Sequence, residues 1–390
     1  MKKLIVLGAD GYLGYPVSVN FSSLGWEVHA VDNLSKRFIE AKLDVQPAIS
    51  IPPFKKRFEA WNESDKNLTK NKITPHIIDI AENSRQLYNL IEEVRPDAII
   101  HFAEQPSAPY SMKGRSEAIS TQTNNVKGTL NLIFAVHKFV PDCHILKLGT
   151  MGEYGTPNID IEEGWLDIEH KGRKDKVIFP KKPSSFYHLS KVHDSHNLEF
   201  ACRVWDLKVT DLNQGIVYGA YTPFTKEEEL STSFHYDSVF GTVINRFISQ
   251  AIIGHPLTVY GGGEQIRAYL HIDDVIQCIS LALKNPPNKG EFKVRNQFTE
   301  FKSVKDLALL VQRSLNPKGY NVEIDFIDNP RIEEPRHYFN PINDSFKKIG
   351  LNPKMIDEEL ILNISNYLKP YSDNIDKRVL IPQIKWNINK

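Results

Sequence analysis

Short apolar runs alternate with helical patterns through the first half of the chain. Residues 4–7 are wholly apolar, and apolar residues then recur at helical spacing through residues 16–21. A second apolar run, residues 27–31, ends at Asp32. Further strands are expected at residues 74–79, 97–103, 144–150 and 207–217, and further helices at residues 84–94 and 124–139. This alternation predicts an α/β fold, a doubly wound parallel Rossmann sheet whose ligands bind beyond the carboxyl ends of the strands.

Three departures from the alternation divide the chain. Residues 41–72, which carry prolines and charges, interrupt the pattern as an insertion, and residues 158–183 form a second insertion that is a candidate cap. After Tyr218 the pattern becomes irregular and rich in aromatic residues, glycine and proline. We therefore expect a dinucleotide-binding domain at residues 1–217 and a smaller mixed C-terminal substrate-binding domain at residues 218–390, with some segments returning to the sheet.

The first strand runs into a turn with glycine at positions 8, 11 and 14. Glycines let the backbone approach a pyrophosphate, and the following helix offers unpaired amides at its N-terminus. The spacing is G-x-x-G-x-x-G, which differs from the general G-x-G-x-x-G fingerprint. Asp32 lies roughly twenty residues further on, where an acid holds the adenosine ribose and repels a 2′-phosphate, so NAD is favoured. Arg37 nearby could bind a 2′-phosphate, so NADP stays open as the cofactor. The alternative to a dinucleotide site is an ordinary βα turn that uses glycine for its geometry.

Tyr187 and Lys191 stand four residues apart, which places both on one face of a helix. A cation beside a phenol stabilises the phenolate, so the tyrosine can take a proton from a substrate hydroxyl. Thr150, at the expected carboxyl end of a strand, is a candidate to share that proton. Most Tyr-x-x-x-Lys pairs are solvated helix faces, and it is the dinucleotide turn that favours a catalytic interpretation.

Composition limits the functions that the chain can have. The 48 basic and 48 acidic residues balance, so no global field recruits nucleic acid or an anionic membrane. No apolar stretch approaches the length of a membrane span or of a signal peptide. Cys143, Cys202 and Cys278 follow no metal or disulfide spacing and indicate free thiols in a reducing, cytoplasmic setting. His193 and His196 lack a third ligand, so no metal site is expected.

Several motifs follow one another along the chain: Gly8/Gly11/Gly14, Asp32-Asn33, Asp79-Ile80, His101-Phe102-Ala103, Asn124-Asn125-Val126-x-Gly128-Thr129, Thr150 and Tyr187/Lys191. In this order they resemble the extended short-chain dehydrogenases/reductases that act on nucleotide sugars. Longer strings are similar to the UDP-sulfoquinovose synthases, a family that joins UDP-glucose to sulfite: residues 148–161, 184–196, 211–215, 239–242 and 296–300.

The resemblance implies which residues bind ligands. It implies NAD contacts at Gly8, Asp10, Gly11, Tyr12, Leu13, Gly14, Asp32, Asn33, Arg37, Asp79, Ile80, Phe102, Ala103, Asn124, Tyr187, Lys191 and Val217. It implies substrate contacts, with UDP bound mainly by residues 218–390, at Gln105, Thr150, Tyr187, Gln214, Thr242, Arg246, Thr258, Val259, Tyr260, Arg267 and Arg331. UDP-glucose and sulfite are the implied partners, and a homodimer built on the helix after Asn124 and the helix bearing Tyr187 is the implied assembly.

The implied reaction uses oxidation at C4 to replace the C6 hydroxyl by sulfonate. A C4 ketone acidifies the C5 proton, and loss of that proton with the C6 hydroxyl leaves an electrophile to which sulfite adds before C4 is reduced again. Related 4,6-dehydratases carry Asp-Glu directly after the threonine, whereas this chain has Met151 and Gly152. His188 and Glu153 are then the titratable candidates for the elimination, and Met151 is a candidate to leave room for sulfite.

One departure from the family pattern concerns the fourth strand. An arginine often follows the Glu-Gln pair there, but here Pro106 follows it, with Lys113 or Arg115 as candidate replacements. Two alternatives stay open at this point. A UDP-sugar 4-epimerase or 4,6-dehydratase shares the cofactor, the UDP contacts and the Tyr/Lys pair. A nucleotide-sensing regulator shares the fold but usually lacks the tyrosine or the lysine, both of which are present here.

Overall fold

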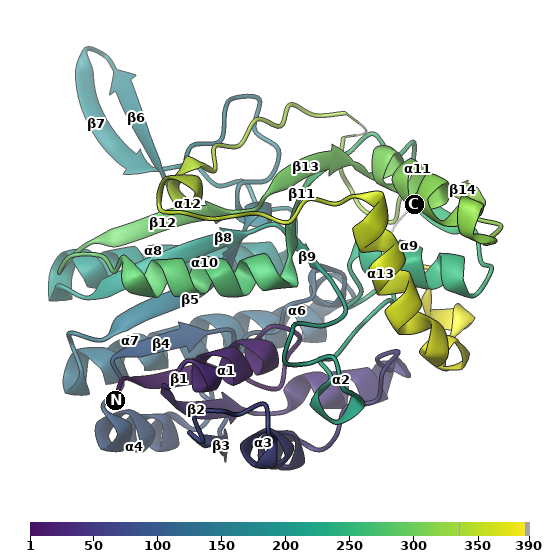
Figure 1. The fold of residues 1–390 in the computed structure, drawn as a ribbon. Coiled ribbons are helices and arrows are strands. Elements are labelled where there is room, and N and C mark those ends of the chain that lie inside the picture. Colours follow the sequence, from purple (N-terminus) through teal and green to yellow (C-terminus); the bar gives the residue numbers. More distant parts are fainter. Residues whose placement is uncertain (335, 387–390) are drawn as a thin grey trace.

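A seven-stranded parallel sheet forms the centre of the computed structural model, which describes residues 1–334 and 336–386 (Figure 1). Its strand order is β12-β8-β5-β4-β1-β2-β3, and every neighbouring pair is parallel. The strands are β1 (Lys3–Leu7), β2 (Glu27–Asp32), β3 (Ile73–Ile77), β4 (Ala98–His101), β5 (His144–Thr150), β8 (Lys208–Gln214) and β12 (Phe292–Gln297). The order reverses between β1 and β4, which confirms the doubly wound α/β prediction.

Helices cover both faces of this sheet, because alternate residues of each strand are apolar on both sides. In β1, Leu4 and Val6 pack with α1 (Gly14–Ser23), α3 (Phe54–Glu63) and α10 (Ile272–Lys284). Ile5 and Leu7 pack on the opposite face, in the core that contains the second set of helices. That set is α4 (Ser84–Val94), α7 (Gly128–Phe139) and α8 (Phe186–Trp205).

Two predicted elements are divided in the structure. The strand expected at residues 207–217 is two strands, since β8 ends at Gln214 and β9 (Ile216–Tyr218) joins another sheet. Gly215 between them lies so close to Ala268 that a Cβ would stand 2.8 Å from its carbonyl oxygen. The helix expected at residues 124–139 begins as a π-helical turn, Thr123–Lys127, and continues as α7.

The C-terminal part builds smaller sheets and a second apolar core. Its strands are β10 (Leu257–Tyr260), β11 (Ile266–His271), β13 (Glu300–Ser303) and β14 (Ile324–Ile327), and its main helices are α9 (Val243–Ile252), α11 (Val304–Leu315) and α13 (Glu358–Leu368). β13, β11 and β9 form one sheet, and β10 pairs with β14. β12 and α10 return to the central sheet and its face, so the two parts exchange segments rather than follow each other.

The two insertions differ in how far they enter the fold. Residues 41–72 contain α3, whose Phe58 and Trp61 are fully buried in the main core. Residues 158–183 form the hairpin β6 (Trp165–His170) and β7 (Arg173–Ile178), which projects from the body in Figure 1. The residues at the base of the hairpin contact the C-terminal part: Ile161 forms a bridge with Pro341, Glu163 accepts hydrogen bonds from Asn296 and Ser345, and Phe179 is buried in a cluster with Phe298.

The remaining helices are short: α2 (Ser35–Leu43), α5 (Ala108–Ser111), α6 (Arg115–Gln122) and α12 (Asp344–Lys348). None of the helices in the described part of the chain has the length and apolar run that a membrane crossing requires.

Candidate active site

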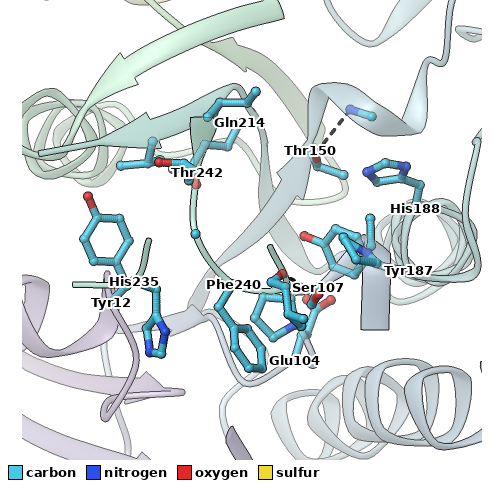
Figure 2. Close-up of a pocket in the computed structure, with 18 of the residues that line it drawn as sticks. Tyr12, Glu104, Ser107, Thr150, Tyr187, His188, Gln214, His235, Phe240 and Thr242 are labelled. Carbon is cyan, nitrogen blue, oxygen red and sulfur yellow. Dashed lines mark hydrogen bonds between the residues drawn. The ribbon is translucent and has the colours of Figure 1, made fainter. Parts of the chain in front are cut away.

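A cavity of about 710 Å³ opens where β1, β4 and β5 end. Its wall includes Gly8, Phe102 and Thr150, which stand at or just after those strand ends. The C-terminal part contributes the opposite wall, with Arg246 and Arg331 among its residues. Figure 2 shows Thr150, Tyr187 and His188 gathered on one side of this space, with Tyr12 and His235 on the other. The sequence motifs therefore meet in one crevice.

The glycine turn after β1 is shaped for close approach of another backbone or a phosphate. Gly8 has a φ of 82°, and a Cβ there would lie 2.5 Å from the carbonyl carbon of Phe102. A Cβ on Gly14 would lie 2.8 Å from the Cα of Ala9. Only glycine fits both positions, and α1 begins directly at Gly14. The turn thus presents bare backbone and a helix N-terminus to the cavity, which fits the pyrophosphate of a dinucleotide.

The end of β2 carries an acid in a fixed orientation. Asp32 accepts hydrogen bonds from the backbone of Asp10 at 2.9 Å and of Leu34 at 2.7 Å. Burial, and then the charge of Asp10, raises the pKa of Asp32 to about 6. Arg37 donates to both carboxylate oxygens of Asp10, at 2.5 and 2.9 Å. Because its guanidinium is already paired, Arg37 is poorly placed to serve a 2′-phosphate, and the arrangement fits NAD.

Most of the predicted cofactor residues line the cavity. The ones that do so are Gly8, Asp10, Gly11, Tyr12, Leu13, Gly14, Asp32, Asn33, Arg37, Ile80, Phe102, Ala103, Asn124, Tyr187 and Val217. Asp79 does not line it. Its carboxylate accepts from the Asn33 side chain at 3.0 Å and from the backbone of Ala81 and Glu82, so it supports the cavity wall from behind.

Thr150 and Tyr187 reach the cavity from two different elements. Thr150 is the last residue of β5, and its Oγ1 accepts a hydrogen bond from the Gly152 amide at 3.2 Å. Tyr187 stands in the first turn of α8, where Ser185 caps the helix by accepting from the His188 amide. Figure 2 shows both hydroxyl-bearing side chains directed into the same space. A hexose hydroxyl placed there can hydrogen-bond to both side chains.

Lys191 lies beneath Tyr187 and is paired with an acid that sequence reasoning did not assign. Its ammonium contacts Glu104 Oε2 at 2.5 Å, donates to Leu148 O at 2.5 Å, and lies 5.8 Å from the Tyr187 ring centroid. Burial, and then Glu104, raises the pKa of Tyr187 above its ordinary value. In the protein alone, burial therefore outweighs the lowering that was expected from Lys191, and Glu104 pairs with the lysine.

His188 occupies the space beside Gly152. A Cβ at position 152 would lie 2.6 Å from His188 Cδ2, so a side chain there is incompatible with the imidazole in its present place. Ser184 contacts His188 Nδ1 at 3.2 Å. Burial, and then Arg331, lowers the pKa of His188 to about 3, so the ring is neutral at physiological pH. Met151 and His188 both line the cavity.

Glu153 does not reach the cavity. Its side chain is fully buried, and its carboxylate binds Lys147 at 3.1 Å, Lys181 at 2.5 Å and the Thr150 amide at 3.0 Å. Although burial raises the pKa of Glu153, Lys147 and Lys181 outweigh it and hold the pKa below its usual range. A carboxylate so paired is unsuited to exchange protons with a substrate. Its position instead fixes the backbone of Thr150.

The opposite end of the cavity is rich in arginine. The predicted substrate residues that line the cavity are Gln214, Thr242, Arg246, Tyr260, Arg267 and Arg331, together with Thr150 and Tyr187. Burial, and then Arg267, lowers the pKa of Arg331, as expected for guanidinium groups that crowd one another. Arg246 donates to the Tyr260 hydroxyl at 2.8 Å, and Arg267 pairs with Glu333. This cluster is chemically suited to a diphosphate.

Other predicted substrate residues lie outside the cavity wall. Gln105 is buried and bonded to Ser107 and Thr121. Thr258 and Val259 are buried in β10, where Thr258 bonds to Gln250. The candidate replacements for the family arginine, Lys113 and Arg115, do not line the cavity either.

Sequence reasoning missed several residues of the wall. Glu104 and His337 line the cavity, and neither ring nitrogen of His337 has a hydrogen-bond partner within the described chain. His235 also lines it and joins α2 to the C-terminal part through Glu40 at 2.8 Å. A charged residue shortly after a buried strand, as Glu104 is after β4 ends at His101, was a signal that would have found one of them.

Comparison with families of known proteins gives a consistent result. Residues 4–296 match the model of the NAD dependent epimerase/dehydratase family. The chain is 46% identical over 386 residues to the chloroplastic UDP-sulfoquinovose synthase of Spinacia oleracea, covering 99% of this chain and 79% of that protein. It is 42% identical over 388 residues to the UDP-sulfoquinovose synthase of Sulfolobus acidocaldarius, covering 98% and 97%.

Solved structures share the fold at lower identity. The UDP-glucose 4-epimerase of Thermotoga maritima with UDP-glucose superposes with a TM-score of 0.68 at 22% identity, covering 94% of this chain and 99% of that one. The UDP-glucuronic acid 4-epimerase of Bacillus cereus, in complex with UDP-glucuronic acid and NAD, superposes with a TM-score of 0.69 at 19% identity and the same coverage. These two similarities establish the architecture and not the reaction.

Proposed function

Because the chain belongs to the UDP-sulfoquinovose synthases, within the NAD dependent epimerase/dehydratase family, we propose that it converts UDP-glucose and sulfite into UDP-sulfoquinovose. The observation that carries this proposal is the identity of 46% and 42% to two proteins of that name across nearly the whole chain. The site agrees with it, because the sequence after Thr150 departs from the dehydratase pattern and His188 fills the resulting space. NAD, the cofactor of the family, would be held by the glycine turn and Asp32, and when bound it would supply a reversible hydride acceptor for C4.

Tyr187 and Thr150 handle the proton of the C4 hydroxyl. Thr150 is fixed by the amide of Gly152 and by the Glu153 carboxylate on its own backbone, so its hydroxyl has a set direction. Tyr187 takes the proton as C4 is oxidised and gives it back when C4 is reduced. The net reaction replaces the C6 hydroxyl by sulfonate and leaves C4 unchanged. Tyr187 therefore holds the C4 hydroxyl proton only until C4 is reduced again.

His188 is the group that we place at C5 and C6. It lines the cavity beside Met151, and its imidazole is neutral, so one ring nitrogen carries no proton. It can take the C5 proton made acidic by the C4 ketone, and the imidazolium can then protonate the departing C6 hydroxyl. Sulfite adds to C6 of the enone, and C5 takes a new proton from water, which His188 can relay. Met151, apolar and unable to titrate, leaves this side of the hexose open to the sulfur nucleophile.

The arginine end of the cavity holds UDP. Arg267 and Arg331 are suited to the two phosphates, and binding a dianion relieves the crowding that lowers the pKa of Arg331. Arg246 donates to Tyr260 on the side that we assign to the nucleoside. Gln214 and Thr242 lie across the pocket from Tyr187 in Figure 2, and we assign them to the sugar. As predicted from the sequence, we propose that residues 1–217 bind NAD and that residues 218–390 bind mainly the UDP-sugar.

A homodimer is part of the proposal. α7 and α8 pack side by side, and their outer faces expose large apolar side chains, with Phe134 at 48% and Phe200 at 51% exposure. Exposed apolar side chains on neighbouring helices favour burial against a second copy. Light scattering at micromolar concentration should give a dimer, and Phe134→Asp should give a monomer. A wild-type monomer under those conditions would remove the dimer from the proposal.

The direct test is product analysis with purified enzyme. Incubation with UDP-glucose and sulfite should give a nucleotide sugar whose mass increases by replacement of hydroxyl by sulfonate, and omission of sulfite should abolish it. UDP-galactose formed without sulfite would instead indicate an epimerase. Tyr187→Phe is the matched inactive control, since it removes one hydroxyl from the site. Binding of NAD and UDP-glucose by the wild type without formation of any product would point to a regulator rather than an enzyme.

A further inference from the structure

A short extended segment crosses the arginine end of the cavity and lies outside the helices and strands of the fold. We call this segment, residues 381–386, the strap. Pro382, Ile384 and Trp386 line the cavity, and the residues between them are exposed. Alternation with a period of two is typical of extended backbone that lies on a surface. The strap therefore presents one face to the cavity and the other to solvent.

The strap is anchored at its two ends. Leu380, directly before it, is fully buried in the second apolar core. At the other end, the amide of Trp386 donates to the carbonyl oxygen of Pro330 at 2.9 Å. The backbone hydrogen bonds of the described chain leave out residues 381–385. A segment held in this way can lift at a smaller cost than a helix or a strand, because few hydrogen bonds have to open.

The indole of Trp386 covers the guanidinium of Arg331. Trp386 is 8% exposed, and Arg331 Cζ lies 5.4 Å from the centroid of its ring, which is a cation–π contact. The only hydrogen bond that Arg331 makes within the described chain is that of its backbone amide to Asn329 Oδ1, at 3.0 Å. The indole face is therefore the contact that directs this guanidinium.

The two neighbouring arginines of the cavity are held by polar groups instead. Arg246 donates to the Tyr260 hydroxyl at 2.8 Å, and Arg267 pairs with Glu333. A π face attracts a guanidinium without occupying its N–H donors, whereas a carboxylate competes for them. Arg331 thus keeps all five donors for a ligand in the cavity.

We propose that the strap covers the diphosphate of the bound nucleotide sugar, and that Trp386 is a positioning residue that directs the guanidinium of Arg331 to that diphosphate. The inference deepens the proposed function and rests on it, because UDP is the ligand assigned to this end of the cavity. Bidentate contact with a phosphate needs two parallel N–H donors in a fixed plane. The indole fixes that plane from the side away from the ligand.

Hydrogen exchange in the wild-type holoenzyme tests whether the strap covers the ligand. Saturating UDP should slow the exchange of the backbone amides in residues 381–386 about tenfold, because the bound diphosphate stabilises the closed strap through Arg331 and Trp386. Uridine at equal occupancy lacks the diphosphate and should leave this exchange unchanged. The projecting hairpin of β6 and β7 should exchange equally in all three states. Equal exchange of the strap with and without UDP would overturn the proposal.

Trp386→Ala tests the positioning role. The Kd for UDP, measured by calorimetry, should rise about tenfold, whereas the Kd for uridine should stay the same, because only UDP reaches Arg331. Trp386→Phe should recover most of the affinity for UDP, since phenylalanine keeps a π face. The matched control is Trp26→Ala, which removes a ring that lies 5.3 Å from the ammonium of Lys2 and outside the cavity wall. This control should bind UDP as the wild type does.

A double-mutant cycle separates positioning of the guanidinium from general loss of structure. In an Arg331→Met background, Trp386→Ala should weaken UDP binding no further. Equal losses of affinity for UDP and uridine in Trp386→Ala, or an undiminished loss without the guanidinium, would overturn the positioning role. If UDP protects the strap but the wild type forms no sulfonated product, the proposed reaction fails and the assignment of the strap to the diphosphate stands.

Discussion

Gly152→Ala tests whether the imidazole of His188 acts at C5 and C6. The backbone at position 152 is not in the left-handed region, so alanine adds no strain of its own there. The added methyl would stand 2.6 Å from His188 Cδ2, and an ordinary contact begins near 3.4 Å. The ring therefore has to move by about 1 Å, away from the position that the hydrogen bond with Ser184 gives it.

The size of the effect follows from that displacement. A misplacement of about 1 Å in a catalytic group costs about 100-fold in rate, whereas overpacking of this kind costs about 1–3 kcal/mol in stability. We expect the exchange of the C5 hydrogen with heavy water, measured without sulfite, to fall about 100-fold. The KM for UDP-glucose should change little, because the arginine cluster is unaffected.

A control variant and a double-mutant cycle show whether the effect of Gly152→Ala comes from His188. At Gly262 an added Cβ would meet Glu264 Cγ at an ordinary 3.8 Å, so Gly262→Ala should leave both exchange and stability close to the wild type. Combining Gly152→Ala with His188→Ala should remove the stability cost of the first change, since the clashing ring is gone. The assignment of His188 to C5 and C6 would be refuted if Gly152→Ala exchanged the C5 hydrogen as fast as the wild type. It would also be refuted if Gly152→Ala cost the same stability with and without the His188 side chain.

Three further outcomes test the surroundings of the site. Lys147→Met should lower the free energy of unfolding by about 3–5 kcal/mol in urea titrations, because it leaves two buried carboxylates short of a cation; Lys174→Met on the exposed hairpin should cost less than about 0.5 kcal/mol. Burial raises the pKa of Asp32 to about 6, and only the ionised carboxylate accepts hydrogen bonds from the ribose hydroxyls. The affinity for NAD, measured by calorimetry, should therefore fall about tenfold per pH unit below that value, and Asp32→Asn should abolish this pH dependence. Arg57→Met should destabilise the protein by about 3–5 kcal/mol and weaken NAD binding, because the fully buried guanidinium contacts Asp10 of the glycine turn at 2.9 Å. An increase in melting temperature on adding NAD that equals the wild-type increase would contradict this.

The fold was largely predictable because inner strands of the central sheet, such as β1 and β4, are buried on both faces. Such strands appear as continuous apolar runs, and the helices between them carry periodic apolar faces. β5 and α4 begin and end where the pattern predicts. The break at Gly215 was not predictable, because it arises from the approach of Ala268, a residue distant in sequence.

The site was predictable only as far as local motifs describe it. The glycine turn, Thr150 and Tyr187 are read from short segments, and the structure brings them to one cavity. The pairing of Lys191 with Glu104 beneath Tyr187 joins residues far apart in the sequence, and no local pattern connects them. For the same reason, the burial of Glu153 behind two lysines could not be read from its place beside Thr150.

The decisive measurement is turnover of UDP-glucose with sulfite in heavy water, with NMR analysis of the hydrogens at C4 and C5 of the sulfonated product. If C4 is oxidised and reduced by one bound cofactor, the product keeps protium at C4 and gains deuterium at C5. Protium at both carbons would mean that sulfite displaces the C6 hydroxyl without any oxidation, and the catalytic roles assigned to Tyr187 and His188 would fail together.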